Sequence, residues 1–133
     1  MTLAIRNSLQ KLLDSEQRAR DRDNRMEAVR LAGEFHVALA DIAGNAVIAR
    51  LIREIVDRTF LVIFMYQAPS PGACVQAEHS SLLKAIGEGD AKGAAQSMLQ
   101  HIESIESRMS LKERAEPSVD LTRAFTGIVD RKA

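Results

Sequence analysis

The chain has 133 residues, 46% hydrophobic and 27% charged, which is ordinary for one globular domain and excludes a disordered chain. Lysine plus arginine and aspartate plus glutamate both number 18, so no net positive charge attracts nucleic acid or an anionic membrane. A single cysteine excludes an internal disulfide, and we see no signal peptide and no run long enough to cross a bilayer. We therefore expect a cytoplasmic protein that does not contact a membrane.

Hydrophobic residues at helical spacing predict a first helix over residues 3–20 and a second over about 25–43. Asp23 or Asn24 can cap the second helix, and Gly44-Asn45 can end it. A third helix begins near Ala46, and its apolar pairs predict that it is the spine of the core. Beyond Leu61 the pattern is apolar nearly all round, which predicts burial by other helices or by a partner subunit.

Residues 68–77, with two prolines and a glycine, predict a loop. Glu78 is expected to open a short fourth helix through Ile86, and Asp90 to cap a fifth running from Ala91 to about Glu113. There is no strand-like alternation and no internal repeat. The predicted fold class is therefore all-α, an antiparallel bundle of about five to six helices, with a domain over residues 1–116 and a tail or short docked helix over 117–133.

The three histidines lie on apolar faces of three different predicted helices. Their apolar neighbours one turn away are Ala32, Gly33, Leu39 and Ala40 for His36, Leu82 and Leu83 for His79, and Met98 and Ile105 for His101. A neutral imidazole is a good ligand for zinc or nickel, so His36, His79 and His101 are a candidate metal site in the bundle. The alternative is that each is a core histidine bonded to its own partners, which would require three separate sets of partners.

Short motifs in a fixed order also carry a resemblance. They are Phe35-His36, Ala43-Gly44-Asn45, Glu78-His79, Ala85-Ile86 with Gly89-Asp90, and Met98 with His101-Ile102. Together they resemble the FCD domain, the helical effector-binding half of FadR-type GntR transcriptional regulators, from about residue 10 to residue 112. The resemblance implies a bundle that binds a divalent metal through His36, His79 and His101, and a small organic acid effector that completes the site. It also implies a homodimer.

The sequence departs from that family in two places. The resemblance implies an aspartate four residues before His36, where this chain has Ala32, so the metal would be held by histidines plus solvent or effector. The family's winged helix-turn-helix and the usual first helix of the effector domain are absent, so DNA contact would come only through a part not in this chain. We therefore expect either an N-terminally truncated product or a freestanding sensor that acts through a partner.

Other polar residues are candidates for binding the effector. Arg53 and Arg58, together with Asn45, are the candidate effector-binding residues, because a guanidinium can pair with a carboxylate. Arg50 lies on the same stripe, and all of these arginines can equally form a solvated helix face. Cys74 can reach a metal from its predicted loop, although a lone loop cysteine is usually incidental.

The sequence thus predicts a ligand-sensing regulatory domain, and not an enzyme. Two alternatives remain open: a metal-dependent hydrolase that uses the three histidines, and a metal-free helical oligomerisation module. No general base or oxyanion donor is placed near the histidines by spacing, which weighs against the hydrolase.

Overall fold

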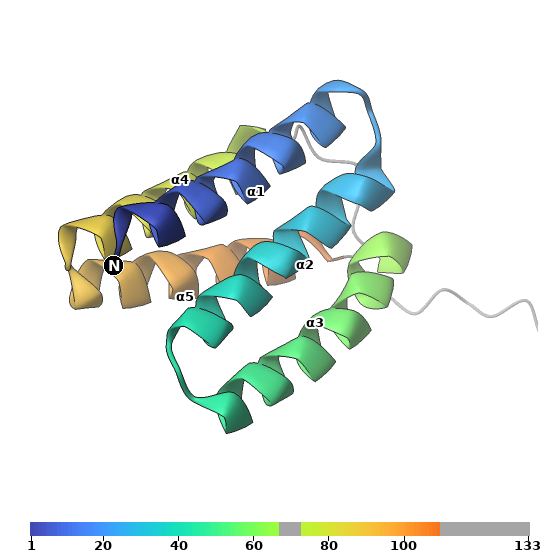
Figure 1. Cartoon of the computed structure of the whole chain (residues 1–133). Coiled ribbons are helices and arrows are strands. Elements are labelled where there is room, and N and C mark those ends of the chain that lie inside the picture. Colours follow the sequence, from blue (N-terminus) through green and yellow to red (C-terminus); the bar gives the residue numbers. More distant parts are fainter. Residues whose placement is uncertain (67–72, 110–133) are drawn as a thin grey trace, which may run out of the picture.

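The computed structural model describes residues 1–66 and 73–109, and these ranges contain five α-helices and no strand. The helices are α1 (Leu3–Asp21), α2 (Arg25–Ile42), α3 (Ala46–Tyr66), α4 (Ala73–Glu88) and α5 (Ala91–Arg108). Consecutive helices run antiparallel and form one bundle (Figure 1). The all-α prediction is confirmed, whereas the predicted tail over residues 117–133 lies outside the described residues.

Short polar turns join α1 to α2, α2 to α3 and α4 to α5 where the sequence predicts them. The side chain of Asn24 accepts from the backbone N–H of Glu27 at 3.2 Å, and the side chain of Asp90 accepts from that of Gly93 at 2.9 Å. Each satisfies a donor that the first turn of a helix leaves free. Gly44 has a φ of 77°, a left-handed conformation that glycine adopts without strain and that reverses the chain between α2 and α3.

The core lies between α1, α2 and α4. Helix α1 packs against both α2 and α4, and α5 packs against α4. The largest apolar cluster buries five side chains from these helices: Leu9, Leu13, Phe35, Leu82 and Leu83. No helix of the described residues is long and apolar enough to cross a membrane.

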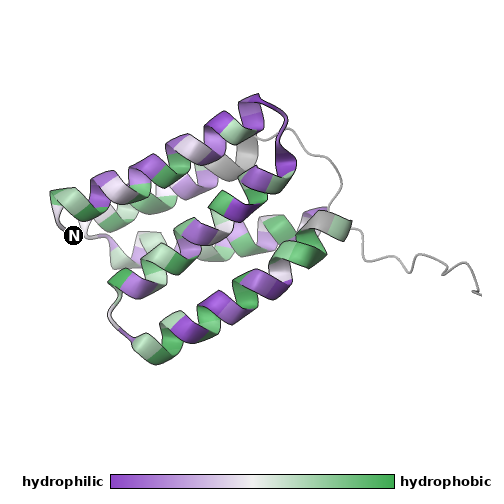
Figure 2. Ribbon diagram, turned by 45° about the vertical axis from the view of Figure 1, so that its right-hand side comes forward, coloured by the Kyte–Doolittle hydropathy of each residue, from purple (hydrophilic) through white to green (hydrophobic). Residues whose placement is uncertain are grey.

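Helix α3 differs from its prediction. It packs only against α2 among the described helices, and of its described side chains only Ala49 is buried. Figure 2 shows it at the edge of the bundle, with hydrophobic residues repeated along its length. The prediction that α3 is the spine of the core is wrong, because its apolar pairs face two directions and only one of them meets α2.

Two predicted helix boundaries also change. Helix α4 begins at Ala73 rather than Glu78, so the predicted loop over residues 68–77 is too long and Cys74 belongs to a helix. The prolines at 69 and 71 precede this start, so they do not prevent the residues after Gly72 from forming a helix. Helix α5 ends at Arg108, because Met109 has an extended backbone, and residues 110–113 lie outside the described ranges.

Candidate metal centre

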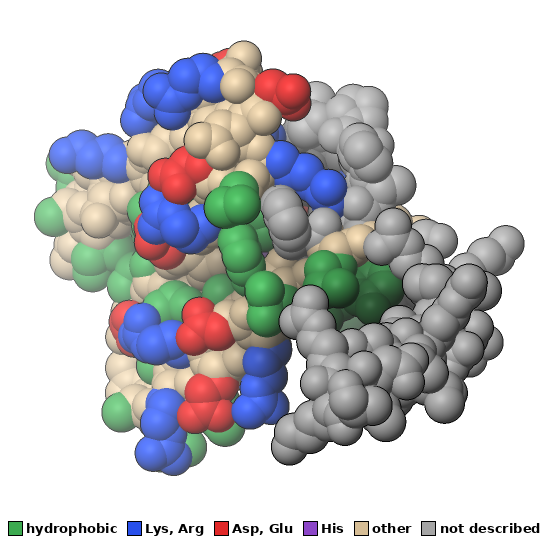
Figure 3. Space-filling view, turned by 90° about the vertical axis from the view of Figure 1, so that its right-hand side faces the viewer, with side chains coloured by type: hydrophobic (Ala, Val, Ile, Leu, Met, Phe, Trp, Pro, Cys, Tyr) green, Lys and Arg blue, Asp and Glu red, His purple; other side chains and the backbone are tan. Residues whose placement is uncertain are grey.

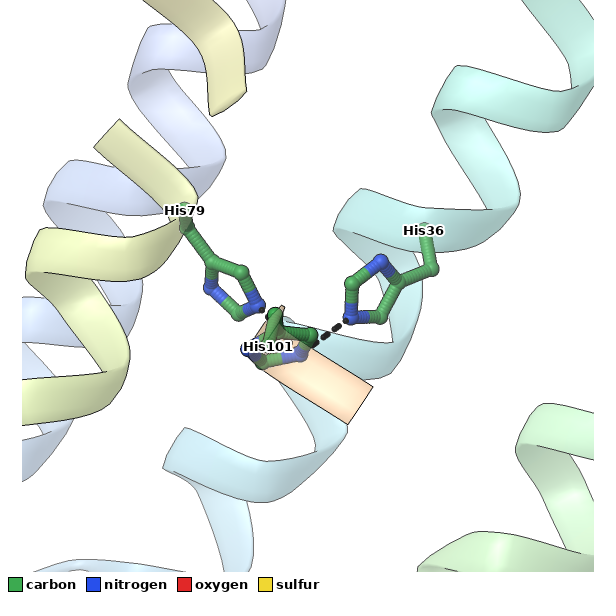
Figure 4. A group of neighbouring side chains, drawn as sticks. All are labelled: His36, His79 and His101. Atoms are coloured by element: carbon green, nitrogen blue, oxygen red, sulfur yellow. Dashed lines mark hydrogen bonds between the residues drawn. The ribbon is translucent and has the colours of Figure 1, made fainter. Parts of the chain in front are cut away.

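The three imidazole rings meet at one point inside the bundle (Figure 4). His36 comes from α2, His79 from α4 and His101 from α5. The Nε2 atom of His101 lies 3.1 Å from Nε2 of His36 and 3.2 Å from Nε2 of His79. One ligand atom from each ring lies within 4.8 Å of the other two. The structure therefore brings together all three histidines that the sequence singled out.

Two of the rings are held from behind by carboxylates. Nδ1 of His79 lies 3.0 Å from Oε2 of Glu16, and both side chains are fully buried. Nδ1 of His101 lies 2.8 Å from Oε2 of Glu78, whose other oxygen accepts from the hydroxyl of Ser104 at 2.7 Å. A carboxylate on one ring nitrogen places the proton there and orients the ring, which is the usual arrangement behind metal-bound imidazoles.

This arrangement leaves Nε2 of His79 and Nε2 of His101 without a proton, so the lone pairs of these two nitrogens face each other. Two facing lone pairs repel unless a proton or a cation lies between them. With metal–nitrogen bonds of about 2.0–2.1 Å, two imidazoles on one ion lie about 2.9–3.4 Å apart. The Nε2 separations of 3.1 and 3.2 Å from His101 fall in this range, and the ligand atoms of all three rings lie within 4.8 Å of one another. Two of the three donor pairs therefore have the spacing of a divalent metal site.

The electrostatics favour the neutral, metal-binding form of His36 and of His101. Burial, followed by the neighbouring rings of His79 and His101, lowers the pKa of His36 to about 3, against the opposing effect of Glu16. Burial, followed by His79, also lowers the pKa of His101, against the opposing effect of Glu78. At neutral pH a proton is therefore a poor occupant of the space between the rings, whereas a metal ion binds the neutral form.

Glu16 is the residue that the sequence analysis missed. Burial alone raises its pKa, but the hydrogen bond and charge of His79, followed by those of Arg20, lower it overall, so the carboxylate is ionised. The signal was present in the sequence: Glu16 continues the stripe of Leu9 and Leu13 on the buried face of α1. An acidic residue at an apolar position of an amphipathic helix indicates a buried partner.

A cavity of about 780 Å³ opens beside the histidines, between α2, α3 and α5. His36 and His101 both lie in its wall, and Ala32 lies there one helical turn before His36. The small side chain of Ala32 supplies no metal ligand. The side of the histidine cluster next to Ala32 therefore faces an open space that solvent or a small ligand can occupy.

The candidate effector-binding residues are not brought together. Arg53 lines the cavity, but its guanidinium pairs with the carboxylate of Asp41 at 3.1 Å. Asn45 caps α3, accepting from the backbone N–H groups of Val47 and Ile48 at 3.1 Å each. Arg58 is exposed and is not among the residues that line the cavity.

Comparison with known families identifies the family of the chain. The family model of the FCD domain matches residues 1–104, and the chain belongs to this family. The FCD domain is the C-terminal effector-binding domain of GntR-family regulators, so the chain falls in a regulatory class and not a catalytic one. No curated protein and no solved structure matches the chain.

Proposed function

We propose that this chain is the ligand-sensing domain of a GntR-type transcription regulator and that it binds a divalent metal through His36, His79 and His101. Zinc or nickel is the metal we expect, because both bind neutral imidazole well. The observation that carries the proposal is the convergence of the three Nε2 atoms while carboxylates hold Nδ1 of His79 and His101.

A small organic acid is the proposed effector, and the cavity beside the histidines is its proposed binding site. When bound, the metal supplies an electrophile that attracts a carboxylate oxygen. The chain's own residues supply the rest: Glu16 and Glu78 orient two rings, and the cavity wall holds the body of the acid. Arg53, which lines the cavity, remains a candidate contact.

The proposed output is a change in how the helices pack, passed to a DNA-binding partner domain across a homodimer. The effector shifts this equilibrium only by its difference in affinity for the two arrangements. The histidines suit this role, because they join α2, α4 and α5 at one point. Loss or gain of a ligand there changes the constraint on three helices together.

The test is metal content, measured by mass spectrometry on the full chain purified without a histidine tag. The chain is stripped with chelator and then titrated with zinc or nickel. We expect about one ion per chain, and its loss in His79→Ala and in His101→Ala. Leu83→Ala is the matched control, because it removes a buried side chain of α4 but no ligand, and it should keep the metal.

Absence of metal from the wild-type chain after titration would overturn the proposal. A metal that persists in both histidine variants would place it elsewhere in the chain. Under the proposal, zinc also raises the melting temperature of the wild type and of Leu83→Ala but not that of the histidine variants.

A further inference from the structure

Arg20 is a partly buried cation in the wall of the cavity. It lies near the end of α1, and only 18% of its side chain is exposed. Its guanidinium bonds to Oε1 of Glu16, the carboxylate whose other oxygen contacts His79. Glu16 is not among the residues that line the cavity. Arg20 is therefore held by a carboxylate in the core while its own side chain borders the open space.

The other two arginines of the cavity wall differ from Arg20. Arg30 and Arg53 have side chains 47% and 54% exposed. Each is paired with a carboxylate that also lines the cavity: Glu34 for Arg30 and Asp41 for Arg53. On the face in Figure 3, basic and acidic side chains likewise alternate, with hydrophobic side chains between them. Pairs of this kind lie in water, where they attract an additional anion weakly.

One donor of Arg20 also lacks a partner. Its Nε atom is buried and has no hydrogen bond within the described part of the chain. Buried donors are nearly always paired, because an unpaired one loses its hydration and gains nothing in return. Only Nη2 of Arg20 bonds to Glu16, and Nη1, which has no bond within the described part of the chain and is not enclosed, can donate to a second acceptor in the cavity.

The rest of the wall is suited to an apolar group. Val56, Phe60 and Ile63 from α3 and Ile105 from α5 line the cavity. A ligand that fills the cavity therefore meets hydrocarbon over much of its surface and meets a cation at Arg20. This combination fits an organic acid with a short apolar chain.

We propose that Arg20 is the anion anchor of this cavity and that it receives the carboxylate of an aliphatic organic acid. The inference deepens the proposed function, since it concerns the same cavity, but it does not require the metal. Because Glu16 contacts both Arg20 and His79, an anion on Arg20 also acts on the carboxylate that orients a metal-binding ring. The anchor thus links the cavity to the histidine cluster and to α1.

The test is isothermal titration of the full, metal-free chain with hexanoate and with hexanamide, which has a similar shape but no charge. We expect hexanoate to bind the wild type about tenfold or more tightly than hexanamide. Arg20→Gln should remove this difference. Arg20→Lys keeps a cation for Glu16 but loses the second donor edge, so it should fold and bind hexanoate more weakly.

Arg30→Gln is the matched control, because Arg30 lines the same cavity, and this variant should bind hexanoate as the wild type does. Equal binding of hexanoate and hexanamide by the wild type would overturn the inference. So would loss of the preference in Arg53→Gln while Arg20→Gln keeps it. Zinc titration of the same variants separates this result from the proposed function, because a chain that fails only here still binds metal.

Discussion

The helices around the histidines and helix α3 use their hydrophobic residues differently. In α1, α2 and α4 the large apolar side chains of the core are buried almost completely, as Leu13 and Phe35 illustrate at 0% exposure. In α3 the corresponding side chains are largely exposed, with Ile55 at 56% and Leu51 at 44%. The comparison teaches that the spacing of apolar residues identifies a helix but does not establish how deeply each face is buried.

The polar groups of the two regions differ in the same way. The carboxylate of Glu16 is buried and shared between His79 and Arg20, so it stabilises only the arrangement that the histidines require. In contrast, the pair between Arg53 of α3 and Asp41 is about half exposed, and water screens its charge. The proposed metal site therefore lies where both the apolar and the charged groups are buried.

The largest expected effect tests the apolar half of this comparison. Leu13→Ala should lower the free energy of unfolding by about 2–5 kcal/mol, because it leaves a cavity in the core. Ile55→Ala, on the exposed side of α3, should lower it by less than about 0.5 kcal/mol. Urea denaturation followed by circular dichroism measures both. Equal losses would mean that the outer side of α3 is covered in solution.

The next effect tests whether the buried carboxylate matters more than an exposed one. Glu16→Gln should weaken zinc binding by about 10–100-fold, because the amide is a poorer acceptor for Nδ1 of His79. Competition with a zinc-binding dye measures the affinity. Glu34→Gln is the matched control, since its exposed pair with Arg30 touches no histidine, and its affinity should not change. If the two variants bind zinc equally, Glu16 does not position His79.

Much of the fold was predictable because it depends on local signals. The polar turn at Asn24 and the glycine at 44 mark helix ends through hydrogen bonds and backbone conformation that involve only neighbouring residues. The depth of α3 was not predictable, because burial depends on which helices are available to cover it. The same pattern of apolar residues would be present in the sequence whether or not another helix covered the outer face of α3.

The three histidines of the candidate site were predictable from the sequence, whereas the charged residues behind them were not. His36, His79 and His101 stand out because a histidine is unusual on an apolar helix face. Glu16 stands 63 positions from His79, so only the packing of α1 on α4 brings them together. Arg20 likewise does not stand out in the sequence, because it follows other charged residues and nothing local indicates that it borders a cavity.

The smallest expected effect tests how closely α3 approaches the rest of the bundle. A Cβ atom added at Gly33 of α2 would lie 2.6 Å from Cγ1 of Val56 on α3, a distance at which the valine side chain or one of the two helices must move. Overpacking of this kind costs about 1–3 kcal/mol, whereas alanine gains up to about 1 kcal/mol over glycine in a helix. Gly33→Ala should therefore lower the free energy of unfolding by about 1 kcal/mol.

Two further variants assign that loss to the contact between α2 and α3. In Gly87→Ala, on α4, the new Cβ meets nothing closer than a Met1 methyl at 3.7 Å, so this change should stabilise the chain slightly. Adding Val56→Ala to Gly33→Ala removes the clashing methyl, so in a double-mutant cycle the two changes should cost less together than the sum of their separate costs. If the two costs simply add, Gly33 is not what brings α3 close to α2, and α3 is held less tightly than the helices around the histidines.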